Sequence, residues 1–323
     1  MGADRPDDGE MPPDEHPDRP PDRNENGSRP GGSGGAAAET RSYEEYYVQL
    51  SAAAAAEKIV AARRISAEEQ AAAEKWDEQS GESREMWGEY LQKWPPDERP
   101  QPDRSDDPPG SWRGEGKRSL DPVENAQVEV ACDRVADLER DKISPAMREV
   151  ESQDPDRQLV GFDHRLKGHD RIKEKVHGTI KDLHRSPEQA VSLVPDAIRY
   201  TLQYRESSYT QGVWADIERL RGQGFVLDKL KNSWSDEQYK GINSQWIDSD
   251  TGQRFEVQFH TRISFEAKQL THDAYKRIRS EQRPGKFEQL ALEAFQKKVT
   301  ADVPVPPGAA DIPDYHKRGA DAG

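Results

Sequence analysis

The segment Arg254–Thr261 carries polar and ionisable side chains at alternate positions. Phe255, Val257 and Phe259 alternate with residues that include Glu256. A period of two is typical of a strand with one apolar face and one polar face. Because a carboxylate fixed on a strand can hold a metal ion in a defined position, Glu256 is a candidate catalytic and metal-binding residue. A solvated strand face is the alternative interpretation.

A second acid, Asp196, follows Pro195 and opens a strand predicted over Ala197–Tyr204. Its ordinary role would be that of a turn residue or of the first residue of a strand. Magnesium is typically held by one or two carboxylates together with phosphate oxygens and water. Two acids on neighbouring strands therefore predict a Mg²⁺ site formed by Asp196 and Glu256.

Residues 164–185 carry seven Arg and Lys against three acids, within a chain whose net charge is −15. A helix is predicted over Asp170–Leu183, and we expect Lys167, Arg171 and Lys175, which are spaced four apart, to share one of its faces. Several cations on one face suit a polyphosphate. The alternative is a solvated helix face.

A second alternating segment predicts a strand over Tyr239–Ile247. Tyr239 would lie on the face opposite the apolar one, so its ring is a candidate for stacking on a nucleotide base. Gly241 would allow a ligand to approach the backbone. The alternative is that Tyr239 packs under the helices. The polar face would consist of Tyr239, Gly241, Asn243 and Gln245.

The order of predicted elements within residues 160–300 indicates an α+β domain with a mixed, mainly antiparallel sheet covered by helices. Asp250-Thr-Gly252 is a good hairpin turn between the last two strands. The predicted strands are Ala197–Tyr204, Phe225–Lys231, Tyr239–Ile247 and Arg254–His260. The predicted helices are Asp170–Leu183, Tyr209–Gln223, Arg262–Arg279 and Lys286–Val299.

The remaining chain divides by composition. Residues 1–40, with seven prolines and ten acids, predict a disordered acidic leader. Residues 41–94 predict helices, with an apolar stripe that packs either within a helical hairpin or against a partner helix. The stripe consists of Trp87, Tyr90, Leu91 and Trp94. We expect a Pro-rich linker at 95–120, a domain at 121–300 whose first helix is bent or broken by Pro145, and a tail at 301–323.

The net charge, the cysteine content and the absence of long apolar runs argue against several classes of protein. The net charge of −15 argues against general binding to nucleic acid or membrane surfaces. The single cysteine, Cys132, excludes an internal disulfide. No apolar run approaches about 18 residues, and no secretory signal is recognisable. We therefore expect a cytoplasmic protein without a membrane partner, with export by a non-classical route as the alternative.

The order and spacing of these residues resemble the synthetase domain of RelA/SpoT-type alarmone enzymes over about residues 160–283. The resemblance implies a nucleotidyltransferase-like mixed sheet flanked by helices. It also implies Mg²⁺-dependent transfer of pyrophosphate from ATP to the 3′-hydroxyl of a guanosine or adenosine nucleotide, with release of AMP. The matching residues are Arg165, Lys167, Lys175, Asp196, Tyr239 to Asn243, Phe255 to Thr261, His272 and Tyr275.

The resemblance also assigns roles. Arg165, Lys167 and Lys175 would hold ATP, and Asp196 and Glu256 would bind magnesium, with Glu256 also able to activate the hydroxyl. The acceptor would be contacted by Tyr239, Asn243, Gln258 and Lys231.

Asn243 stands where the classical family has a histidine, which leaves the acceptor open. The alternatives are a tRNA pyrophosphokinase and a non-catalytic nucleotide-binding interaction protein. No hydrolase domain is recognisable, so a growth-inhibiting toxin or effector, neutralised by an antitoxin or immunity protein, is a further hypothesis.

Overall fold

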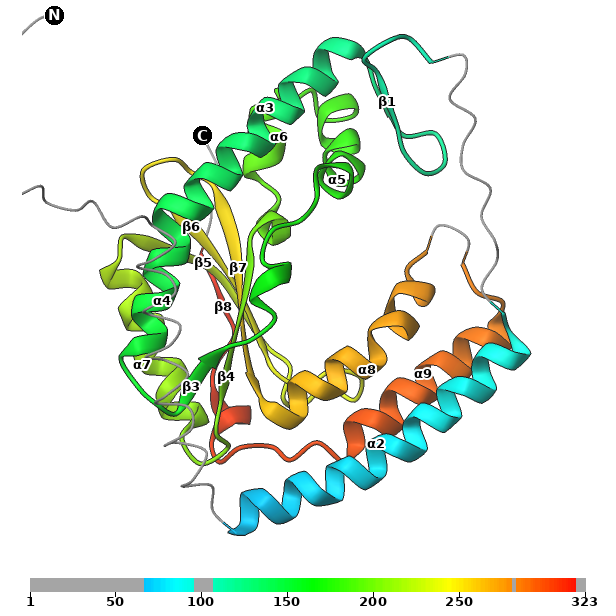
Figure 1. Cartoon of the computed structure of the whole chain (residues 1–323), viewed down its shortest axis with the longest axis vertical. Coiled ribbons are helices and arrows are strands. Elements are labelled where there is room, and N and C mark those ends of the chain that lie inside the picture. The colour runs from blue at the N-terminus through cyan, green and yellow to red at the C-terminus, as the bar shows by residue number, and fades with distance from the viewer. Residues whose placement is uncertain (1–66, 96–106, 281–282, 318–323) are drawn as a thin grey trace, which may run out of the picture. The chain divides into compact units, whose positions relative to one another are not determined.

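The computed structural model of the chain describes residues 67–95, 107–280 and 283–317 (Figure 1). No helix in these ranges combines the length and apolar character needed to cross a bilayer. The helices are α2 (Ala67–Lys93), α3 (Pro122–Leu138), α4 (Ser144–Ser152), α5 (His169–Lys181), α6 (Pro187–Ser192), α7 (Tyr209–Gly222), α8 (Arg262–Ile278) and α9 (Lys286–Ala301). The strands are β1 (Trp112–Arg113), β2 (Ser119–Leu120), β3 (Arg157–Leu159), β4 (Arg199–Tyr204), β5 (Phe225–Asn232), β6 (Ile242–Asp248), β7 (Arg254–Thr261) and β8 (Tyr315–His316).

The main sheet has the strand order β3-β4-β7-β6-β5-β8. β4 and β7 run parallel, and the other neighbouring pairs of this sheet are antiparallel. The predicted fold class, α+β with a mixed, mainly antiparallel sheet flanked by helices, is therefore confirmed. The short strand β3 and the short helix α6 were not predicted.

The two faces of the sheet differ in chemistry. Phe255, Val257 and Phe259 of β7 are fully buried on the apolar face, where the Tyr209 hydroxyl of α7 donates a hydrogen bond to the Phe259 carbonyl at 2.9 Å. Figure 1 shows α4 and α7 on this side of the sheet, and α5 and α8 on the other. The polar face, which carries Glu256, therefore looks toward α5 and α8.

A bulge in β5 sets which of its residues reach the polar face. Leu227 pairs with Trp246 and Lys229 pairs with Gln245, which leaves Asp228 as an extra residue. Strict alternation would put Leu227 and Lys229 on the same face, and the bulge separates them. As a result, the leucines of β5 are buried while its lysines lie in register with polar residues of β6.

Two strands begin later than predicted. β6 begins at Ile242 rather than at Tyr239, because Gly241 has a φ of 141°, outside the strand region. β4 begins at Arg199, because Pro195–Ala197 form a short 3₁₀ turn. The first difference places Tyr239 in the loop before β6 rather than within the strand, and the second places Asp196 in a turn that precedes β4.

Lys167 does not lie on the helix with Arg171 and Lys175, and that prediction was wrong. α5 begins at His169 after a Gly168 N-cap. Lys167 lies in the preceding extended stretch, where its backbone amide donates to the Ala197 carbonyl at 2.9 Å. The position of Lys167 is thus fixed by pairing with the segment before β4.

The predicted long helix from Asp121 is interrupted before Pro145 by a π-helical turn, Glu139–Ile143. The turn buries the Glu139 carboxylate, which is 1% exposed. Its Oε1 accepts hydrogen bonds from Arg165 Nε at 2.7 Å and from the Tyr200 hydroxyl at 2.5 Å. Glu139, between α3 and α4, thereby connects these helices to Arg165 and to Tyr200 of β4.

Helix α2 packs on α8 and α9 of the same chain. Trp76 donates from Nε1 to Glu266 at 2.7 Å, and the Trp87 ring lies 5.1 Å from that of Phe295. The apolar stripe that includes Trp87 therefore meets an internal partner. The leader 1–40 and residues 41–66 of the predicted helical segment lie outside the described residues.

Parts of the predicted linker and tail belong to the folded domain. Trp112 of the β1–β2 hairpin is buried and donates from Nε1 to Asp170 at 2.9 Å. Downstream of α9, Val303, Ala309 and Ile312 are buried, and β8 pairs with the edge of β5. The segments predicted as linker (95–120) and tail (301–323) thus contain buried residues, which proline and charge content do not reveal.

Replacing Glu139 by Ala should lower the free energy of unfolding by about 3 kcal/mol, because it removes the buried carboxylate that accepts from both Arg165 Nε and the Tyr200 hydroxyl. Chemical denaturation would measure this. Glu149→Ala, on the exposed side of α4, is the matched control and should cause little change. If Glu139→Ala lowers the free energy of unfolding no more than Glu149→Ala does, this role of the Glu139 carboxylate is contradicted.

Candidate active site

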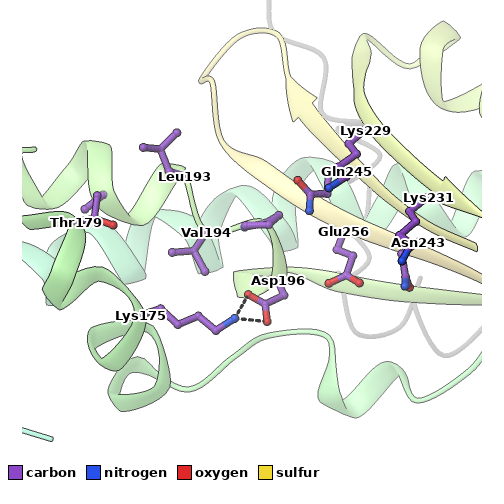
Figure 2. Close-up of a pocket in the computed structure, with 12 residues that line it drawn as sticks. Lys175, Thr179, Leu193, Val194, Asp196, Lys229, Lys231, Asn243, Gln245 and Glu256 are labelled. Atoms are coloured by element: carbon purple, nitrogen blue, oxygen red, sulfur yellow. Dashed lines mark hydrogen bonds and ion pairs between the residues drawn. The ribbon is translucent and has the colours of Figure 1, made fainter. Parts of the chain in front are cut away.

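A pocket of about 490 Å³ lies on the polar face, between α5, the end of α6 and strands β5 to β7. It brings together five of the residues predicted from the sequence: Lys175, Asp196, Lys231, Asn243 and Glu256. Figure 2 shows the Asp196 carboxylate turned toward Lys175, and Asp196 and Glu256 both line the pocket. Residues separated by 60 positions or more in the sequence thus meet at one site.

Asp196 is held by two lysines. Lys175 Nζ lies 2.7 and 2.6 Å from its two carboxylate oxygens (Figure 2), and Lys167 Nζ lies 3.2 Å from Oδ2. Burial acts to raise the pKa of Asp196, but the hydrogen bonds and charges of Lys175 and Lys167 outweigh it and lower the pKa below its ordinary value. The carboxyl is therefore ionised at neutral pH and available as an anionic ligand.

Glu256 is positioned by its strand neighbours on both sides. In register it pairs with Arg199 of β4 and with Gln245 of β6. Two residues further along β7, Gln258 Nε2 donates to Glu256 Oε1 at 2.5 Å. The carboxylate is thus oriented by a side-chain amide on a rigid strand, as a general base or a metal ligand requires.

Lys229, Gln245 and Thr179 also line the pocket and were not predicted as site residues. Gln245 was placed on the correct strand face, together with Asn243. Lys229 could have been inferred from the sequence, because it lies two residues before Lys231 on the same strand. The direction of both side chains, however, depends on the bulge at Asp228.

Arg165 does not join the other predicted ATP-binding cations. Its Nε donates to Glu139, and its guanidinium lies 4.2 Å from the centre of the Phe162 ring. Arg171, on the exposed side of α5, pairs with Glu174 at 3.0 Å. Of the basic residues predicted from segment 164–185, Lys167 and Lys175 are the two that contact Asp196.

Tyr239 lies half-buried next to the start of β6. Its hydroxyl donates to Asn243 Oδ1 at 2.9 Å and lies 2.9 Å from Nε2 of the buried His260. A Cβ added to Gly241 would stand 2.6 Å from the His260 ring, so the glycine makes room for this histidine. Burial lowers the pKa of His260 well below its ordinary value, which leaves a neutral ring as the hydrogen-bond partner.

A lysine from α8 continues the polar network. Lys268 Nζ donates to Gln258 Oε1, and Gln258 in turn donates to Glu256. Burial, followed by the charge of Arg199, lowers the pKa of Lys268 to about 8, while Glu256 acts in the opposite direction. Neither Lys268 nor Arg199 was a site prediction from the sequence, since nothing local marks a helix lysine that points at a strand.

The side chains of the pocket can be compared with the ligands that a bound metal ion needs. In the described ranges, no cluster of three or more His, Cys, Asp and Glu side chains could hold one. Two carboxylates that face one pocket are nevertheless what Mg²⁺ uses when phosphate and water complete its shell. The chemistry of Asp196 and Glu256 therefore fits a magnesium–polyphosphate complex better than a closed structural metal site.

Replacing Lys175 by Met should raise the pKa of Asp196, which carbon-detected NMR titration of the carboxyl group would measure. A depressed pKa stabilises the fold above the unfolded-state value of about 3.9, and this is lost as the pH falls through the folded value. In the variant this stabilisation should be smaller, and its loss should be complete at a higher pH than in the wild type. Arg171→Met removes an equal charge from the same helix and should leave Asp196 unchanged; an equal shift in both would contradict the pairing.

No known family's sequence profile matches the chain, and no curated protein matches it in sequence. Among solved structures, a Streptococcus mutans protein is similar over 54% of this chain and 89% of its own, at 16% identity and a TM-score of 0.37. Small alarmone synthetase 1 from Bacillus subtilis is 14% identical with a TM-score of 0.35, covering 53% of this chain and 88% of its own. A GTP pyrophosphokinase family protein from Streptococcus pneumoniae is 15% identical with a TM-score of 0.35, covering 55% and 85%.

Proposed function

We propose that this chain transfers the pyrophosphate group of ATP to the 3′-hydroxyl of a nucleotide and releases AMP. The observation that carries the proposal is a single pocket lined by Asp196 and Glu256 together with Lys175, Lys229 and Lys231. Carboxylates suit Mg²⁺ and lysines suit phosphate oxygens, so the pocket suits a magnesium-bound polyphosphate. The order of motifs described above, which resembles RelA/SpoT-type synthetases, supports the same reaction.

The reaction needs positioning and charge neutralisation more than covalent chemistry. The acceptor 3′-oxygen attacks the β-phosphorus and forms a new P–O bond. The bond from that phosphorus to the oxygen bridging to the α-phosphate breaks, and AMP leaves with the electron pair. Glu256 would accept the proton of the 3′-hydroxyl, and Gln258, whose Nε2 donates to Glu256 Oε1, would hold the carboxylate in position.

The lysines of the pocket bind the negative charge of the substrates. Lys229 and Lys231 come from one strand, and Lys175 comes from the helix across the pocket, so a polyphosphate would be contacted from two sides. Bound by Asp196 and Glu256, Mg²⁺ would neutralise charge on the phosphate oxygens. Asn243 and Lys231 share a register position on β6 and β5 and would contact the acceptor.

Glu256→Gln and Asp196→Asn should each abolish AMP release while leaving the fold intact, because the first removes the proton acceptor and both remove a metal ligand. The assay is incubation of the full chain with labelled ATP and GDP, GTP, AMP, ADP or deacylated tRNA. Mass spectrometry of the products would identify the acceptor by an added pyrophosphate.

Glu174→Gln, which neutralises an acid on α5 that pairs with Arg171, is the matched control and should keep wild-type turnover. Near wild-type turnover by either pocket variant would refute the assigned roles. Failure of the wild-type chain to turn over ATP with every acceptor would refute the enzymatic proposal and favour a non-catalytic interaction protein.

A further inference from the structure

A second group of basic side chains lies on the other side of Glu256. Arg199, Lys268 and His272 form this group, named here the α8 cation cluster. Arg199 is the register partner of Glu256 on β4, whereas β6 and β5, with Lys229, lie on the opposite side of β7. The carboxylate of Glu256 thus separates two sets of cations.

Helix α8 presents two of the three members to the sheet. Lys268 is anchored by its hydrogen bond to Gln258, and His272 follows four residues later, on the same side of the helix. Arg199 and His272 are half-buried, and within the described ranges their side chains make no hydrogen bond or ion pair with other residues. Their donors are therefore available to a ligand.

Electrostatics shows that the three groups lie close enough to act on one another. Burial and then Arg199 lower the pKa of Lys268. Burial, followed by Lys276, lowers the pKa of His272, and Arg199 and Lys268 add to this effect while Asp273 opposes it. Like charges confined in a half-buried site destabilise one another unless an anion is bound between them.

We propose that the α8 cation cluster binds a phosphate group of a substrate nucleotide. A guanidinium presents paired donors that match phosphate oxygens, and a lysine and an imidazole beside it supply further donors. The inference rests on the proposed function: a reaction between two phosphate-bearing nucleotides at one carboxylate needs cations on both sides of it. The phosphate belongs either to ATP or to the acceptor.

Equilibrium binding to the full chain tests this without turnover. Isothermal titration would compare inorganic pyrophosphate, ATP, ADP and GDP in the wild type, Arg199→Gln and Lys268→Met. Loss of a charge-assisted hydrogen bond should weaken affinity about tenfold or more for the nucleotide whose phosphate occupies the cluster. Arg199→Lys should bind more tightly than Arg199→Gln but more weakly than the wild type, because it keeps the charge and loses the paired donors of the guanidinium.

Arg262→Gln removes an equal charge from α8 at an exposed position paired with Glu266 and should leave affinity unchanged. Affinities within twofold of wild type for all four ligands in both cluster variants would overturn the proposal, as would an equal loss in Arg262→Gln. If Lys268→Met unfolds on heating before the wild type does, the two Arg199 variants decide the result.

Weakening confined to ATP assigns the cluster to the donor, and weakening confined to ADP or GDP assigns it to the acceptor. Both results support the cluster. If the chain binds these ligands through the cluster yet transfers nothing to any acceptor, the proposed function fails and the binding site stands.

Discussion

The parallel pairing of β4 with β7 is the constraint on which the site depends. The Glu256 amide donates to the Ile198 carbonyl at 2.9 Å, and Arg199 is its register partner. This pairing brings Asp196, in the turn just before β4, to the pocket that Glu256 lines. A slip of one residue would turn Glu256 toward the apolar face and bring Phe255 or Val257 into the pocket, so the hydrophobic face of β7 also secures the carboxylate geometry.

The polar face of the sheet is a connected network rather than a set of separate side chains. Lys268 donates to Gln258, Gln258 donates to Glu256, and Lys175 and Lys167 neutralise Asp196 across the pocket. Interactions of this kind are strong in a half-buried site and costly when one partner is missing. In a chain of net charge −15, this local excess of cations is the feature that makes the face suited to phosphate.

The sequence predicted what local periodicity controls. Alternation identified β7 and the outward position of Glu256, because a strand repeats every two residues. It could not locate the bulge at Asp228, since the pattern does not show which residue lacks a partner. Nor could it show that Arg165 bonds Glu139, 26 positions away, because that contact depends on a π-helical turn and on the burial it creates.

The central claim is that Asp196 and Glu256 act on one ion. Mn²⁺ affinity in the presence of a non-hydrolysable ATP analogue, measured by electron paramagnetic resonance, tests it in the wild type, Asp196→Asn, Glu256→Gln and the double variant. Carboxylates that share an ion are coupled, so the double variant should lose clearly less affinity than the sum of the two single losses. Strictly additive losses, or an affinity that neither substitution alters, would contradict the shared site.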